Sequence, residues 1–277
     1  MSDQYSVSLL CRVLGVSRSG YGAWQAQAQG TRAQENARLD QAIQETFLDQ
    51  RQAYGSPRLA VELQAQGWSC SENRVARRMQ VLGLQARRKR RFVPRTTQSD
   101  PASPIAPNRM AERPAPTGVN QVWVADITYL PTQAGFVYLA CVLDRYSRRI
   151  VGWSLAATLE SQLVLAALGQ AVRRRAPTAG CLHHSDRGSQ YASQAYRQLL
   201  AEQKLEASMS RAGNCYDNAA MESFWSTLKA EGLNEVLADE AATRQAVFDY
   251  IETFYNPRRR HSALGYKSPV DFENQIN

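Results

Sequence analysis

The fold is decided by residues 181–229, which read CLHHSDRGSQYASQAYRQLLAEQKLEASMSRAGNCYDNAAMESFWSTLK. A short apolar run begins at Cys181 and ends at Asp186, and an Arg-Gly-Ser sequence follows it. This pattern is typical of a buried strand that ends in a turn. We therefore expect Asp186 to lie at the tip of a strand.

A helix is expected near the end of the same stretch. Met221, Trp225 and Leu228 recur at helical spacing, and Asn218 or the aspartate before it is a suitable N-cap. Glu222 therefore lies in the first turns of this helix. One acid ends a strand, and the other lies near the start of a helix.

A third acid, Asp126, interrupts the β-rich run VWVADITYL of residues 122–130. From this run onward the pattern predicts strands at 122–129, 135–144, 149–154, 181–186 and 205–210, with helices at 161–175, near 193–204 and around Glu222. The antiparallel strands come first and the parallel strands later. This order predicts an α/β fold, a ribonuclease H-like mixed five-stranded sheet with helices on both faces.

In such a sheet the first strand is central and the fourth strand is its neighbour. Asp126 and Asp186 would then meet at adjacent strand ends, with the Glu222 helix packed across them. Three carboxylates this close repel one another unless a cation neutralises them, and oxygen ligands suit Mg²⁺, with Mn²⁺ expected to substitute. Two such ions about 4 Å apart promote in-line phosphoryl transfer. We expect the three acids to hold divalent metal, and we assign neither His183 nor His184 as a ligand.

Residues 51–95 are expected to form a small all-α helix-turn-helix region with a basic tail. One helix ends at Gly67, and Ser71 caps the next helix, whose apolar side holds Val75 and Met79. The other side carries the arginines expected to contact DNA, which are Arg74, Arg77 and Arg78. The basic run that follows favours DNA binding over an ordinary helical hairpin, and it consists of Arg87, Arg88, Lys89, Arg90 and Arg91.

Two further segments complete the expected domain organisation. Residues 1–50 are an N-terminal helical segment, in which Ser17 caps a second helix that Gly20 and Gly22 should keep very short. We interpret it as an incomplete DNA-binding unit or a docking segment. A Pro-rich linker at 96–120 then leads to the catalytic region, residues 121–277, with its C-terminal helical extension.

Composition limits the remaining possibilities. The net charge of +8 favours a polyanionic partner. No apolar run is long enough to span a bilayer and no signal pattern is present, so we expect a cytoplasmic protein without a membrane partner. The five cysteines are scattered without a CxxC pair, and no histidine precedes Cys181, which argues against disulfides and against zinc.

The motifs around the three acids resemble a known family. Residues 187–221, thirty-five in number, separate Asp186 from Glu222, which matches the DD(35)E spacing of retroviral integrases and bacterial insertion-sequence transposases. The words WVADITY at 123–129, HSDRGSQY at 184–191 and YDNAAMESF at 216–224 resemble the second-reading-frame (OrfB) product of the IS-three family. YGSPR at 54–58 and YNPRRRHSALGY at 255–266 extend the resemblance over nearly the whole chain.

The resemblance implies roles for individual residues. Asp126, Asp186 and Glu222 match the metal-binding catalytic triad of an integrase catalytic core. Lys229, two helical turns after Glu222, matches a basic residue expected to contact the terminal DNA of the element. Further DNA-binding candidates remain open to a structural reading: Arg187 would touch phosphate or order its loop, Asn218 would shape the site, and Arg258 and Arg259 would bind DNA or lock the C-terminal helix onto the sheet.

The family also implies partners and a reaction. A transposase or integrase of this kind binds the terminal inverted repeats of an insertion sequence and target DNA, and it cleaves and joins strands. Homo-oligomers are expected because two ends must meet, and the upstream reading-frame product is an expected partner or fusion. Two alternatives stay open, namely a catalytically silent DNA-binding regulator and a ribonuclease H-type nuclease or junction resolvase.

Overall fold

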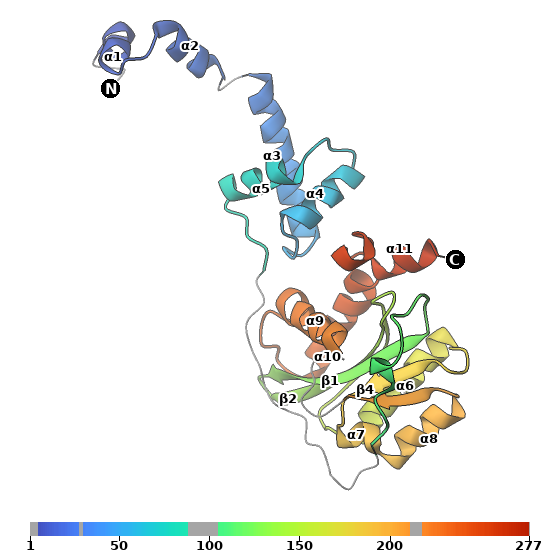
Figure 1. Ribbon diagram of the computed structural model, residues 1–277. Coiled ribbons are helices and arrows are strands. Elements are labelled where there is room, and N and C mark those ends of the chain that lie inside the picture. Colours follow the sequence, from blue (N-terminus) through green and yellow to red (C-terminus); the bar gives the residue numbers. More distant parts are fainter. Residues whose placement is uncertain (1–4, 28–29, 88–104, 211–217, 277) are drawn as a thin grey trace. The chain divides into compact units, whose positions relative to one another are not determined.

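The computed structural model describes residues 5–27, 30–87, 105–210 and 218–276 (Figure 1). The chain divides into two compact units, Met1–Ala86 and Arg87–Asn277. Each unit has its own buried side chains, so each is described by itself.

The first unit is all α. Its helices are α1 (Val7–Val13), α2 (Arg18–Gln27), α3 (Thr31–Asp49), α4 (Ser56–Ala65) and α5 (Glu72–Val81). The backbone amide of Gly20 donates to Ser17 Oγ at 2.9 Å, which confirms the predicted cap. The prediction that α2 would be very short is wrong, because the helix continues through both of its glycines. A glycine within a helix costs only about 1 kcal/mol, which does not end it.

Helices α3, α4 and α5 pack together around one small core. Its fully buried apolar side chains are Leu39, Ile43, Phe47, Leu59, Leu63 and Val75. The boundary expected at residue 50 therefore falls inside a packed unit, because α3 supplies half of these side chains. Ser71 caps α5 as predicted, since its Oγ accepts from the amide of Arg74 at 3.3 Å.

The second unit contains a five-stranded sheet in the order β3-β2-β1-β4-β5. Its strands are β1 (Val122–Thr132), β2 (Gly135–Asp144), β3 (Ile150–Ala156), β4 (Leu182–Ser185) and β5 (Glu206–Met209). The β1–β2 and β2–β3 pairs are antiparallel, whereas the β1–β4 and β4–β5 pairs are parallel. The predicted ribonuclease H-like mixed sheet is confirmed, and β1 lies at its centre.

Helices cover both faces of this sheet. Figure 1 shows α6 (Ser161–Arg175), α7 (Ser189–Ala192) and α8 (Gln194–Glu202) on one side and α9 (Ala219–Thr227) on the other. Gly152 of β3 lets α6 approach closely, because a Cβ there would lie 2.2 Å from the carbonyl oxygen of Ala167. The remaining elements are η1 (Arg109–Ala111), η3 (Leu228–Gly232), α10 (Glu240–Phe248), η4 (Asp249–Tyr255), η5 (Ser262–Leu264) and α11 (Pro269–Asn274).

The C-terminal elements are joined to the sheet by polar contacts. The side chain of Asn256 accepts from the amide of Ile150 at 2.9 Å and donates to its carbonyl at 2.9 Å. Arg149 and Arg175 both bind the carboxylate of Glu273. Within the described part of the chain, no helix is both long and apolar enough to cross a bilayer.

Candidate active site

The register of the central strands aligns the two aspartates. Val122 pairs with Leu182 and Val124 pairs with His184, so Asp126 and Asp186 stand at the same level two residues further on. Asp186 follows the last residue of β4, as predicted. Asp126 lies in the middle of β1 rather than at a strand end, because β1 continues as a hairpin with β2 as far as Thr132.

Side-chain alternation turns Asp126 toward α9. Its neighbours Trp123 and Ala125 belong to the core beneath α6, so Asp126 lies on the opposite face of the sheet. There the indole Nε1 of Trp225 donates to Asp126 Oδ2 at 2.9 Å. Trp225 belongs to α9, and Glu222 lies three residues earlier on the same helix. The structure thus brings α9 and its glutamate to the level of the two aspartates.

The three acids influence one another through their charges, and the effect is clearest in the pKa of Asp126. Burial raises the pKa of the Asp126 carboxyl from its ordinary 3.8 to about 7, and the charges of Asp186 and Glu222 both add to the rise. The hydrogen bond from Trp225 lowers this pKa but does not offset the other effects. Across the described residues, no group of three His, Cys, Asp or Glu side chains is close enough to form a ready-made metal site. Glu222 is exposed, and residues 211–217, which precede its helix, lie outside the described residues.

The turn after β4 holds Asp186 in place. The amide of Gly188 donates to Asp186 Oδ1 at 2.9 Å, and a Cβ at Gly188 would lie only 3.1 Å from that oxygen. Arg187 Nε donates to the carbonyl of Ser210 at 2.8 Å, which ties the end of β4 to the end of β5. This contact supports the loop-ordering interpretation of Arg187.

Lys229 lies near the same acids. It is the second residue of the π-helical segment η3, which follows α9 directly. Its Nζ lies 5.5 Å from the ring centroid of Tyr129, a residue of β1. Burial lowers the pKa of Lys229, and the charge of Asp126 acts in the opposite direction. Lys229 therefore lies close enough to sense the Asp126 charge.

Asn218 is the N-cap residue of α9, as predicted, but its side chain makes no capping hydrogen bond. Its Oδ1 is buried and has no hydrogen-bond partner among the residues that the structure describes. The aspartate before it lies outside those residues.

Arg259 is the clearest correction to the predicted DNA contacts. Its side chain is 1% exposed, and it binds Glu231 through Nε at 2.6 Å and Nη2 at 2.7 Å. The Tyr250 hydroxyl donates to the same carboxylate at 2.9 Å. The alternative interpretation, that Arg259 locks the C-terminal extension, is the one the structure supports. Arg258 is exposed, and its DNA contact stays a prediction.

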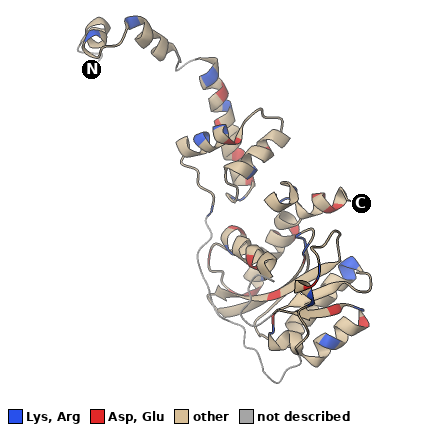
Figure 2. Cartoon of the chain, in the orientation of Figure 1, with Lys and Arg blue, Asp and Glu red and all other residues tan. Residues whose placement is uncertain are grey.

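The arginines of α5 divide into two kinds. Arg78 forms a two-pronged ion pair with Asp40 of α3, at 2.6 and 2.5 Å, and Arg74 donates to Asn36 at 3.0 Å. Figure 2 shows that α3 carries both acidic and basic residues, and its acidic residues include Asp40. Arg77 is exposed. Asn73 and Gln80 share its exposed helix face, and charge alone does not single out such neutral polar residues in the sequence.

Of the basic run after α5, only Arg87 can be described, and it is half-buried. Arg88, Lys89, Arg90 and Arg91 lie outside the described residues. Their contact with DNA stays a prediction.

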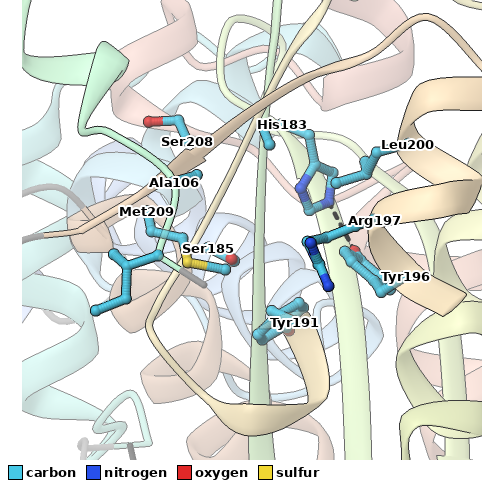
Figure 3. Close-up of a pocket in the computed structure, with 11 residues that line it drawn as sticks. Ala106, His183, Ser185, Tyr191, Tyr196, Arg197, Leu200, Ser208 and Met209 are labelled. Carbon is cyan, nitrogen blue, oxygen red and sulfur yellow. Dashed lines mark hydrogen bonds between the residues drawn. The ribbon is translucent and has the colours of Figure 1, made fainter. Parts of the chain in front are cut away.

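A cavity of about 150 Å³ lies among β4, β5, α7 and α8 (Figure 3). Inside it the Tyr196 hydroxyl and His183 Nε2 form a hydrogen bond of 3.0 Å. Burial and the adjacent His184 lower the pKa of His183 to about 3, so its imidazole is neutral. His184 Nδ1 bonds Ser208 Oγ at 2.9 Å. His183 faces the cavity, whereas His184, the next residue of β4, points to the other face of the sheet. Both imidazoles are buried and hydrogen-bonded within the fold, and none of the three acids lines the cavity.

The sheet order, with Asp126 on the central strand and Asp186 after the neighbouring strand, is that of an integrase core. Two family models for the integrase core domain match residues 116–215 and 203–269, and a model for an HTH-like domain matches residues 33–92. The HTH-like match confirms the predicted helix-turn-helix region.

Relatives identify the family. The chain is 44% identical over 271 residues to the uncharacterized 31 kDa protein of insertion element IS600 from Shigella sonnei, covering 97% of this chain and 98% of that protein. It is 40% identical over 275 residues to the transposase InsF of insertion sequence IS3A from Escherichia coli K12, covering 98% and 95%. The chain belongs to the IS3 family of insertion-sequence transposases.

Two solved structures are more distant. The HTLV-2 integrase catalytic core domain in complex with magnesium, in a dimeric form, is 16% identical with a TM-score of 0.44, over 57% of this chain and 98% of that one. The simian T-cell lymphotropic virus intasome in complex with a PP2A regulatory subunit is 13% identical with a TM-score of 0.46, over 79% and 70%.

Proposed function

We propose that this transposase cleaves the ends of its insertion sequence and joins them to target DNA by metal-dependent phosphoryl transfer, with Asp126, Asp186 and Glu222 as the catalytic acids. The observation that carries the proposal is the setting of Asp126. It is level with Asp186, it faces the helix that bears Glu222, and both neighbours raise its pKa. A protein gains nothing in stability from such an arrangement, which is typical of a site that awaits a cation.

The donor set fits a hard divalent cation. Carboxylate oxygens are the ligands that Mg²⁺ and Mn²⁺ prefer. Burial is the main cause of the raised pKa of Asp126, and a bound cation would offset the repulsion from Asp186 and Glu222 that adds to it. Asp126, Asp186 and Glu222 would hold it, with the exposed Glu222 moving toward the two fixed aspartates. When bound, the metal supplies activation of the attacking hydroxyl and stabilisation of the leaving oxygen.

The protein's own groups position the DNA. The carboxylates of Asp126 and Asp186 are fixed by a paired strand and a tight turn, so their spacing does not depend on substrate. Lys229, half-buried beside Tyr129, offers a cation to a DNA phosphate close to the acids. Arg187, the residue after Asp186, orders the loop there through its hydrogen bond to the carbonyl of Ser210.

DNA recognition is assigned to the first unit. Helix α5 would enter the major groove with its exposed face, which presents Arg77, Asn73 and Gln80. Arg78 contributes indirectly, because its ion pair with Asp40 fixes α5 against α3. Two inverted repeats must be held together, so we propose that a homo-oligomer acts, with the upstream reading-frame product as partner or fusion.

The test is excision of a marked copy of the native insertion sequence in cells, with the upstream reading frame supplied. Wild type is compared with Glu222→Gln and with Glu235→Gln, a matched change at an exposed glutamate outside the site. We expect joined ends with wild type and with Glu235→Gln, and none with Glu222→Gln. Equal excision by all three would remove Glu222 from the mechanism. No excision by any of them, with binding to the ends retained, would favour a catalytically silent regulator.

A further inference from the structure

We propose that Trp225 is a positioning residue, which orients the Asp126 carboxylate for the divalent cation and holds α9, the helix that bears Glu222, against β1. The inference rests on the proposed function, because it assigns a role within that site. Its basis is the 2.9 Å hydrogen bond from the indole Nε1 to Asp126 Oδ2.

The indole is held so that its N–H has one direction. Trp225 is 7% exposed, and its ring lies 4.9 Å from that of Phe224, which in turn contacts Tyr255 edge-on at 4.9 Å. An indole N–H only donates, and when buried it requires an acceptor. Here the acceptor is one oxygen of Asp126, so rotation of the carboxylate would break the bond.

The same bond joins two elements of the site. Asp126 belongs to the central strand β1, and Trp225 belongs to α9, one turn after Glu222. Residues three apart on a helix lie on the same side, so the contact that places Trp225 against β1 also directs Glu222 toward that end of the sheet. One hydrogen bond therefore holds α9, which bears Glu222, against β1, which bears Asp126.

Donors that orient a metal-binding carboxylate have a measurable effect. Their loss typically weakens metal affinity by about 10- to 100-fold, because the ligand must then be ordered when the ion binds. The change Trp225→Phe keeps an aromatic ring among Phe224 and Tyr255 and removes the N–H. We expect its metal dissociation constant to rise by about 10- to 100-fold.

The chain offers a matched control. Trp153 Nε1 also donates to a carboxylate, Glu252 Oε1, at 2.9 Å, and Trp153 is 9% exposed. This pair joins β3 to η4 and includes none of the three acids. Trp153→Phe therefore reproduces the loss of a buried indole–carboxylate bond without touching the site.

The experiment uses the purified full chain, with the upstream reading-frame product added for cleavage, and two readouts. Mn²⁺ binding is measured without DNA, from the electron paramagnetic resonance signal of the free ion. Cleavage of the native insertion-sequence ends is measured over a range of Mg²⁺ concentrations. We expect Trp225→Phe to bind Mn²⁺ more weakly and to need about 10- to 100-fold more Mg²⁺, with its rate largely restored at saturation. Trp153→Phe should match wild type in both readouts.

Other outcomes separate the inference from the function it rests on. Wild-type Mn²⁺ binding and cleavage, both abolished by Asp126→Asn, with Trp225→Phe unchanged or tighter in its metal binding, would overturn the role of Trp225 alone. Wild type that neither binds Mn²⁺ nor cleaves would overturn the proposed function as well.

A measurement on wild type covers a variant that fails to fold. In protein labelled with ¹⁵N at the indoles, the Trp225 N–H should stay protected from hydrogen exchange when Mg²⁺ is added. Loss of that protection on adding Mg²⁺ would mean that the metal displaces the indole, which contradicts the proposal.

Discussion

The pKa of a buried carboxyl shifts in opposite directions in two regions, around Asp126 on the sheet and around Glu273 in the C-terminal extension. In the extension, burial raises the pKa of Glu273, but hydrogen bonds from Arg175, Ser147 and Arg149 more than compensate, so the pKa is lowered. On the sheet, burial and two acidic neighbours raise the pKa of Asp126 to about 7. Both regions lie in one unit and both take carboxylates out of water.

The difference distinguishes acids that are paired within the fold from the acids of the proposed metal site. Glu231 and Glu273 are neutralised by arginines of the same chain, at distances of 2.6 to 2.9 Å. Asp126 has two acidic neighbours, Asp186 and Glu222, and its hydrogen bond from a side chain comes from a neutral donor, the Trp225 indole. The first arrangement stabilises the fold. The second brings acids together beside a neutral donor, which suits the cation of the proposed function.

The largest expected effect is on catalysis. Asp126→Asn should reduce strand cleavage by at least about 10³-fold, equivalent to roughly 4 kcal/mol of transition-state stabilisation, because it removes one of three acids around the cation. The measurement is the rate of end cleavage at saturating Mg²⁺. Glu235→Gln should cleave at the wild-type rate, and cleavage by Asp126→Asn within a few-fold of wild type would remove Asp126 from the site.

The next effect concerns the buried pair in the extension. Arg259→Met should lower the free energy of unfolding by about 3–5 kcal/mol, because it leaves Glu231 charged and buried without its partner. Urea unfolding of the second unit would report this loss. Arg109→Met is the control, since Arg109 is 48% exposed in its pair with Glu206 and such pairs contribute at most about 1 kcal/mol. Equal losses in the two variants would contradict the structural role of Arg259.

Stability against pH should sharpen the contrast. Without metal, the folded chain keeps a proton on Asp126 up to about pH 7, whereas the unfolded chain releases it near pH 3.8. The stability from this group is therefore present at about pH 4 and is lost as the pH rises to 7. Asp126→Asn should raise the free energy of unfolding at pH 8 by roughly 2–4 kcal/mol and have little effect at pH 4. Thermal unfolding with a chelator present would measure both, and a loss of stability at pH 8 would refute the prediction.

The smallest effect has the opposite pH dependence. The lowered pKa of Glu273 means that its stabilisation is complete above its ordinary pKa of 4.5 and is lost as the pH falls through the lowered value. Glu273→Gln should therefore cost about 2 kcal/mol at pH 7 and progressively less below pH 4. A constant cost across this range would show that packing, and not charge, accounts for the effect.

Sequence periodicity predicts the sheet well because strand burial depends on local pattern. The bounds of α6 agree with the predicted 161–175, and the strands agree to within a few residues. The alignment of Asp126 with Asp186 follows from the strand order. The mid-strand position of Asp126 could not be predicted in this way, because the length of β1 is set by its pairing with β2 and not by its own residues.

Long-range partners explain the predictions that failed. Arg259 was a candidate DNA contact because charge normally indicates exposure, yet Glu231, twenty-eight residues away, allows it to be buried. Arg78 meets Asp40 from thirty-eight residues away. The Trp225–Asp126 bond spans ninety-nine residues, and helical spacing indicated only that Trp225 is apolar. Such pairs are not visible in any local pattern.

The connectivity of the sheet also orders events during synthesis. The β1–β2–β3 meander joins neighbouring segments, whereas the proposed site needs the parallel β1–β4 pair and the later helix α9. Local pairings form sooner than distant ones, and domains fold from the N-terminus as they leave the ribosome. The three-helix unit that packs around Leu39 and Val75 is complete long before α9 is made. A nascent chain can therefore fold its first unit before the segments that form the proposed site have been made.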